Sequence, residues 1–378
     1  MKKLFLVVLA IIAFQNFSFA KIRRVGFFAP PVTGTDYSTF ALAYTAATIG
    51  DTILVFPGIP AINQIFTKKI IIIGPGSWLN PNSTPKGNAN LQAFAGTVGI
   101  NSLTFNAGSE GSVVMGLEGG TINVSASNIT IRRNREIVVY IAIVNVVTAI
   151  TNLQVLENYR VNIANYYANG SSFTNMNISN NLITSFSTAP LNTYSGNISN
   201  NLWAFDNTLT APANGGATAL TGAYDITLGG GAYLFQNNIL VCYTSASLAS
   251  NYNYFPILNG TNTVFNNNLA LQTGTGPSQA WGTGTGNVIT PVANAANIFD
   301  GFPAIGSFSA DARYKLKSGS PASTAGAGGT PIGMFAGSTP FKLGLVPTIP
   351  SIYLLTSPQG NNPPGNTIQI NVSTRGNN

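Results

Sequence analysis

The sequence predicts an all-β protein whose strands wind into a parallel β-solenoid. The first observation is a set of short apolar runs that end in asparagine, at Asn134, Asn158, Asn181, Asn201, Asn238 and Asn268. The second is that residues at fixed offsets from these asparagines are nearly always apolar. The third is composition: 45% of residues are hydrophobic and only 7% are charged, which suits stacked buried strands and excludes coiled coils and disordered chains.

Apolar columns define the strands on either side of each asparagine. Three residues before it stand Ile131, Val155, Ile178, Ile198, Phe235 and Phe265. One residue after it stand Arg135, Tyr159, Leu182, Leu202, Ile239 and Leu269, and three after it stand Ile137, Val161, Thr184, Ala204, Val241 and Leu271. Alternating apolar positions indicate strands with one buried face. Such coils become stable only by stacking. An antiparallel sandwich would explain the short strands but not the aligned columns.

The asparagines themselves fall where the chain must turn. Asparagine tolerates left-handed backbone geometry, and stacked asparagine side chains form a ladder of amides. We therefore expect Asn181 and Asn201 to lie about one strand spacing apart, ~4.8 Å. The intervals between the six asparagines are 24, 23, 20, 37 and 30 residues. The interval of 37 is close to two periods and predicts a hidden turn near residue 220.

Residues 1–20 have the organisation of a signal peptide. Lys2 and Lys3 precede an apolar stretch, and a small-x-small site ends at Ala20. The stretch is shorter than the ~20 residues that span a membrane, which argues against an anchor. We expect a Sec signal of the Gram-negative bacterial type, a secreted or cell-surface protein, and no membrane span in the mature chain. The mature net charge of +5 gives no support for a nucleic-acid partner.

Residues 21–342 are predicted to form one β-helix domain, with residues 21–58 as its N-terminal cap. Thr35 and Asp36 can cap a helix that runs to about Thr48, and a strand from Thr52 to Phe56 follows. Residues 137–150 are predicted to be buried strand. Residues 343–378 hold five prolines around two strand-like runs, 352–355 and 367–372, and are predicted to form a C-terminal hairpin or tail.

The helix followed by Gly50–Gly58 (GDTILVFPG) resembles the cap and first coil of secreted right-handed parallel β-helix proteins, the pectate-lyase-like superfamily. Lys69–Gly76 resembles the next strand and turn, and Asp311–Ala322 with Gly329–Phe335 resembles the terminal coils. The likeness covers roughly residues 22–342. It implies the right-handed fold but no single activity, because this superfamily includes lyases, hydrolases, esterases, adhesins and tailspikes.

Catalytic chemistry has little support in the sequence. There is no histidine, a single cysteine (Cys242), and no closely spaced pair among the ten acidic residues. The resemblance makes calcium possible, but the acids do not cluster as its ligands would. The best carboxylate pair is Asp206 and Asp225, which would stack on neighbouring coils if a turn lay near residue 220. Trp203 and Tyr224, close to them in sequence, are the candidate sugar-binding rings.

Two functions follow as hypotheses. The first is a non-catalytic exported scaffold, adhesin or glycan-binding protein, with a polysaccharide or cell-surface glycan as partner and no cofactor. The second is a polysaccharide lyase or glycoside hydrolase that uses Asp206 and Asp225.

One charged pair is expected from the stacking of the coils. Arg133 should stack on Glu157 from the next coil and form a lateral ion pair of small energetic value.

Overall fold

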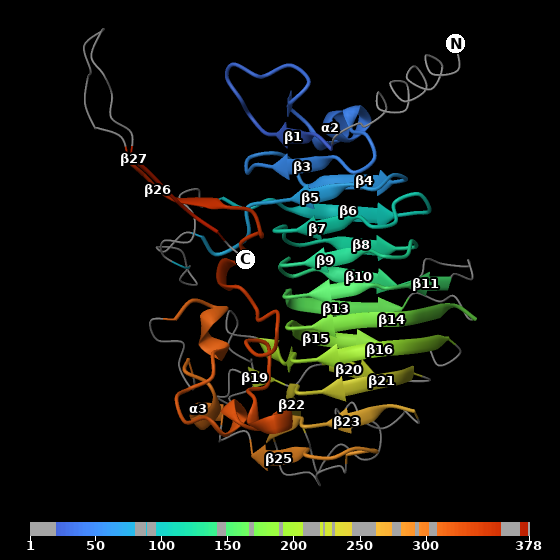
Figure 1. The fold of residues 1–378 in the computed structure, drawn as a ribbon, viewed down its shortest axis with the longest axis vertical. Coiled ribbons are helices and arrows are strands. Elements are labelled where there is room, and N and C mark those ends of the chain that lie inside the picture. The colour runs from blue at the N-terminus through green and yellow to red at the C-terminus, as the bar shows by residue number, and fades with distance from the viewer. Residues whose placement is uncertain are drawn as a thin grey trace, which may run out of the picture.

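The computed structural model describes residues 20–79, 88, 96–141, 149–165, 170–188, 192–206, 220–221, 224–228, 231–243, 262–273, 281–291, 295–301, 308–356 and 371–376. In these residues the chain forms a stack of coils that builds up two long parallel sheets, as in a parallel β-helix (Figure 1). The predicted fold class is confirmed.

Successive strands of the chain alternate between the two sheets. In spatial order the first sheet contains β2 (Asp36–Tyr37), β1 (Ile22–Val25), β3 (Thr52–Val55), β5 (Ile71–Ile73), β7 (Val113–Met115), β9 (Thr130–Arg132), β12 (Gln154–Leu156), β14 (Ser172–Ser179), β16 (Thr193–Ser199), β21 (Gly231–Gln236) and β23 (Val264–Asn266), with β11 (Ala149–Thr151) also beside β14. The second contains β4 (Ile62–Phe66), β6 (Ile100–Phe105), β8 (Thr121–Val124), β10 (Val138–Ile141), β13 (Tyr159–Asn165), β15 (Leu182–Ser187), β17 (Leu202–Trp203), β22 (Ile239–Tyr243), β24 (Leu269–Thr273) and β25 (Val288–Pro291), with β20 (Tyr224–Thr227) also beside β15. The predicted strand 137–150 is thus divided between β10 and β11, in different sheets.

The column three residues before each asparagine lies inside the solenoid. Ile178 pairs with Val155 on one side and Ile198 on the other, and all three side chains are fully buried. This is the stacking that the alternating pattern predicted, since each coil adds one apolar side chain to a continuous core.

The asparagine ladder is confirmed. Asn181 donates from Nδ2 to Oδ1 of Asn201 at 3.0 Å, and its backbone N–H donates to the same oxygen at 3.0 Å. Its Nδ2 also donates to the carbonyl of Val155 at 2.8 Å. The same contact with the next rung recurs from Asn134 onward and ends on a seventh asparagine, Asn287, which the sequence analysis missed. Each ladder amide therefore supplies hydrogen-bond partners to backbone N–H and C=O groups at the turns.

The left-handed residue in each turn is not the ladder asparagine but the residue before it. Positive φ angles of 54° to 72° occur at Arg133, Glu157, Asn180, Asn200, Asn237, Asn267 and Gly286. The expectation that the ladder asparagine takes this geometry is wrong. A left-handed residue lets the next side chain point inward, which is what the ladder requires.

The interval between Asn201 and Asn238 holds one coil, not two, because these two side chains bond directly at 3.0 Å. The hidden turn near residue 220 is therefore not present. The chain leaves the second sheet after β17, forms the antiparallel pair β18 (Phe205–Asp206) and β19 (Leu220–Thr221), and returns as β20. Both β17 and β20 pair with β15, so they are two halves of one strand position.

The column one residue after each asparagine faces outward from Tyr159 onward. Leu182, Leu202, Ile239 and Leu269 are buried, but in a second hydrophobic cluster outside the solenoid. The residue after each of them, such as Ile183 or Trp203, points into the main core instead. The earlier Val161 points inward because Arg160, with φ of 56°, inserts a bulge before it.

The N-terminal cap is a short helix, α2 (Phe40–Ala46). Its N-cap is Thr39, whose side chain accepts from the N–H of Leu42 at 3.3 Å, so the prediction that Thr35 and Asp36 cap it is wrong. Phe40 and Ala43 are buried and pack on the main core. Asp36 instead belongs to β2, where it pairs with Arg24.

The residues after β25 fold back along the outside of the solenoid (Figure 1). They contain α3 (Ala295–Ile298) and the 3-10 turns η2 (Ala312–Tyr314), η3 (Pro321–Ser323), η4 (Ala327–Gly329) and η5 (Leu343–Leu345). Residues 308–348, here named the C-terminal strap, cover the outward apolar column. The segments that resemble terminal coils, Asp311–Ala322 and Gly329–Phe335, belong to this strap and form no coil. Beyond it, β26 (Ser351–Thr356) and β27 (Asn371–Arg375) pair antiparallel, as the predicted hairpin requires. The predicted run 352–355 lies in β26, but the run 367–372 shares only residues 371 and 372 with β27, and residues 367–370 lie outside the described residues.

The strap runs toward earlier coils as the chain proceeds. Its Gly333 N–H bonds to the carbonyl of Asn237, and its Met334 carbonyl accepts from Asn180. Further along, the Val346 carbonyl accepts from Arg133 and Thr348 contacts Met115. The strap thereby ties together coils that are far apart in the sequence.

Candidate functional site

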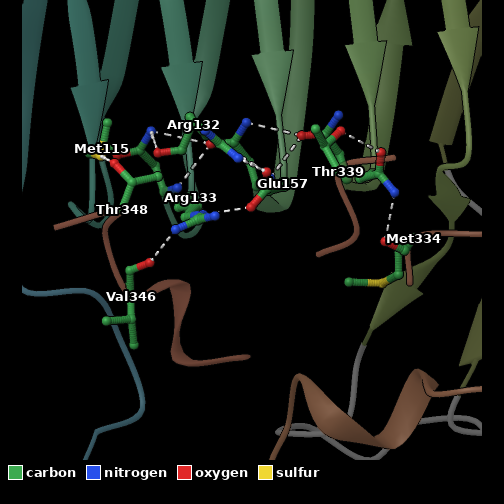
Figure 2. Close-up of polar contacts among 12 residues, drawn as sticks. Met115, Arg132, Arg133, Glu157, Met334, Thr339, Val346 and Thr348 are labelled. Carbon is green, nitrogen blue, oxygen red and sulfur yellow. Dashed lines mark hydrogen bonds and ion pairs between the residues drawn. The ribbon is translucent and has the colours of Figure 1, made fainter. Parts of the chain in front are cut away.

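A buried charge cluster lies where the strap crosses the turns (Figure 2). Glu157 is fully buried and accepts from Arg133 Nε at 2.5 Å and from the guanidinium of Arg132. Arg133 is also fully buried, and its Nη1 donates to the carbonyl of Val346 at 2.8 Å. The expected lateral pair of Arg133 and Glu157 is present, but its burial makes it energetically important rather than negligible, because breaking a buried pair costs about 3–5 kcal/mol.

Desolvation dominates the electrostatics of this cluster. Burial lowers the pKa of Arg133 despite the opposing attraction of Glu157, and Arg132 nearby lowers it further. Both Arg133 and Glu157 also occupy left-handed positions, with φ of 55° each, where four other coils have asparagine. With its carboxylate held by two guanidiniums, Glu157 has the partners of a structural group rather than those of a catalytic acid.

The other acids of the described chain are mostly bound to its own groups. Asp51 pairs with Arg23, Asp36 with Arg24, and Glu118 and Glu136 with arginines of neighbouring coils. Asp311, fully buried in the strap, accepts from Asn88, from Ser309 and from the N–H of Gly344. Within the described residues no three His, Cys, Asp or Glu side chains come together as a group that could hold a metal ion.

The candidate pair Asp206 and Asp225 loses its geometric basis. The pair was predicted from a hidden turn near residue 220, and no such turn exists. Asp206 lies in β18, on the excursion after β17, whereas Asp225 lies in β20 at a register shift beside β15. The backbone therefore places both in the same coil and not one above the other on neighbouring coils.

The candidate sugar-binding ring Trp203 is a core residue. It has no exposed surface, packs against Phe186 and Phe235, and directs its indole N–H at Oδ1 of Asn238 at 3.4 Å. A ring without exposed surface cannot stack on a sugar, so the prediction for Trp203 is wrong. Tyr224 begins β20, and its side chain lies outside the described residues.

The most regular polar surface is the outer face of the first sheet. Two rows of amides, here named the outer amide rows, cross successive coils: Asn128, Asn152 and Asn175 in one, and Gln154, Asn177 and Asn197 in the other. Within the first row Asn152 donates to Asn128 at 2.8 Å and Asn175 donates to Asn152 at 2.5 Å. In the second row Asn177 donates to Gln154 at 3.0 Å. The interior-facing neighbours such as Val155 fix the outward direction of these side chains.

The chemistry of the outer amide rows is that of a repeating neutral surface. Asn128 and Asn175 are exposed, and the other four side chains are half-buried. Amides offer both donors and acceptors, and the coil repeat presents them at about one strand spacing, ~4.8 Å. The repeat of turn asparagines in the sequence does not point to these residues.

Comparison with protein-family models, with curated proteins and with solved structures finds no match to this chain. The fold is therefore established by the chain's own strand pairing. Within the described residues no helix combines the length and the apolar composition that crossing a bilayer requires.

Proposed function

We propose that this protein is an exported β-helix scaffold or adhesin that binds a neutral glycan, without cleaving it, through the outer amide rows. The observation that supports the proposal is the uncharged, regularly spaced array of amides on coils β9 to β16. An extended polymer that repeats hydroxyl groups can engage such an array by many weak contacts. The signal-peptide pattern of residues 1–20 and the resemblance to secreted β-helix proteins support export.

A lyase or hydrolase is the weaker hypothesis. General acid–base work needs a titratable group within hydrogen-bond reach of the reacting proton. The engaged acids described above bind groups of the protein itself, and the backbone has Asp206 in β18 and Asp225 in β20 of the same coil rather than on neighbouring coils.

The test is a binding and turnover screen with purified exported protein on neutral and acidic polysaccharides. We expect retention on a neutral polymer and no product release, with or without calcium. Asn152→Ala and Asn175→Ala each remove about one hydrogen bond of ~1 kcal/mol and should weaken binding about fivefold each. Asn101→Ala, an exposed asparagine on β6 of the other sheet, is the matched control and should bind normally.

Two results would reject the proposal. One is the absence of retention on any neutral polymer. The other is product release that Asp206→Asn or Asp225→Asn abolishes, which would favour the enzyme.

A further inference from the structure

A buried carboxylate at the start of the solenoid is bonded to the first residue that follows the predicted cleavage site. Asp51 is fully buried and immediately precedes β3. Its Oδ1 accepts from the backbone nitrogen of Lys21 at 2.8 Å and from Thr48 Oγ1 at 3.1 Å. Its Oδ2 accepts from Arg23 Nε at 2.8 Å and from the Thr48 N–H at 2.9 Å.

Among the residues that the structure describes, Lys21 is also the first whose main chain is bonded to the coil. Its carbonyl accepts from the N–H of Thr52 at 2.9 Å, directly beside the Asp51 contact, and β1 begins at the next residue. Lys21 and Ala20 are both exposed, so the peptide bond between them lies at the surface. The sequence pattern places the cleavage site directly before Lys21, the residue whose backbone nitrogen is bonded to Asp51.

Hydrolysis of this bond changes the group that faces Asp51. Water adds across the amide, Ala20 leaves with a carboxylate, and Lys21 gains an α-ammonium at neutral pH. The nitrogen that now donates as a neutral amide at 2.8 Å would then donate as a cation. A charge-assisted hydrogen bond to a carboxylate is roughly twice as strong as a neutral one.

We propose that cleavage between Ala20 and Lys21 removes residues 1–20 and that the new α-ammonium of Lys21 pairs with buried Asp51, which holds the first coil more strongly in the processed protein than the neutral amide does. The inference rests on the export part of the proposed function and is independent of glycan binding. It assigns Asp51 a role as the acceptor of the mature N-terminus.

The charged surroundings set the expected pH dependence. Arg23 on β1 is the other cation on Asp51, and its Nη1 contacts the Tyr37 hydroxyl of β2 at 2.8 Å. The carbonyl of Lys69 accepts from the N–H of Gly50, next to Asp51, but the Lys69 ammonium lies near Gly111 instead. Burial raises the pKa of Asp51, and the hydrogen bonds from Lys21, Thr48 and Arg23 outweigh it and lower that pKa. Asp51 is thus ionised at neutral pH and available to an ammonium.

Pairing with an anion raises the pKa of an α-amino group above its ordinary ~7.7–8.0. The stability that this ion pair adds is therefore fully present below about pH 7.7, and it is lost as the pH rises through the raised pKa of the α-amino group.

The experiment expresses the full-length chain in a bacterium with a Sec system and purifies the exported protein. Mass spectrometry of the N-terminal peptide should show Lys21 as the first residue. Labelling of the α-amino group as a function of pH should give a pKa at least about one unit above the ordinary range. A variant with Gly-Ser inserted between Ala20 and Lys21 keeps the Lys21 amide but moves the α-amino group away, and its α-amino pKa should be ordinary.

Thermal midpoints provide the second readout. The wild type should melt above the insertion variant at pH 6, and the difference should vanish at high pH. Asp51→Asn should restore an ordinary α-amino pKa in the wild-type terminus. The insertion variant keeps the test decisive if Asp51→Asn fails to fold. A first residue other than Lys21, or an ordinary α-amino pKa in the wild type, would overturn the inference. None of these measurements uses a glycan, so a failure of glycan binding leaves their outcome intact.

Discussion

Four other coils have asparagine where this coil pair has Arg133 and Glu157. Replacing these two residues with asparagine, singly and together, should show how much of the loss of unfolding free energy comes from leaving one buried charge without its partner. Glu157→Asn removes the carboxylate that pairs with Arg133, whose side chain is 1% exposed, and should cost about 3–5 kcal/mol of unfolding free energy. Arg133→Asn should cost less, about 1.5–3 kcal/mol, because Arg132 still neutralises Glu157. The double variant removes both charges and places asparagine at two left-handed positions, where it is better tolerated. It should lie within about 1 kcal/mol of the wild type.

Urea unfolding monitored by circular dichroism measures these free energies. Native-state hydrogen exchange at the amides of the neighbouring turns is measured in parallel, because coils of a solenoid can open locally. Glu136→Gln is the matched control: this half-exposed acid pairs with Arg160 at 3.1 Å, and its loss should cost less than about 1 kcal/mol. A double variant as unstable as Glu157→Asn would refute the reasoning, since the cost would then not come from an unpaired charge.

Two further predictions concern the ladder and the core. Asn201→Ala removes four buried hydrogen bonds and should lower the unfolding free energy by about 3 kcal/mol or more. Asn200→Gly in the same turn, at φ of 54°, is the control and should change it by less than about 1 kcal/mol. Urea unfolding midpoints compare the two variants, and equal losses would contradict the role of the ladder. Burial, with a smaller effect of Tyr194, raises the pKa of Tyr233 well above its usual value, so native stability should fall as pH rises above about 10, the ordinary tyrosine pKa. In thermal melts, Tyr233→Phe should reduce the loss of stability at alkaline pH. If the pH profile of the melting temperature is unchanged in this variant, the buried Tyr233 hydroxyl is not the cause of the loss.

The sequence determined the repeating part of the fold because that part depends on local pattern. An apolar residue three before each turn asparagine, as at Ile178 and Ile198, specifies an inward-facing strand position in every coil. The ladder partners of Asn181 and Asn201 follow from the same repeat, since identical turns stack on one another. The first strand of the C-terminal hairpin was also predicted, at residues 352–355, whereas β27 begins only at Asn371, near the end of the second predicted run.

Tertiary structure decided the features that depend on partners far away in the sequence. The outward column that includes Leu182 and Leu202 is apolar, as a core column would be, and only the strap shows that it is covered from outside. Trp203 became a core ring because β17 has the stacking register of β15 and β22, with no extra coil between Asn201 and Asn238. Arg133 donates to the carbonyl of Val346, which comes 213 residues later in the strap. Contacts of this kind leave no period in the sequence, since each is made once, by a segment that does not repeat.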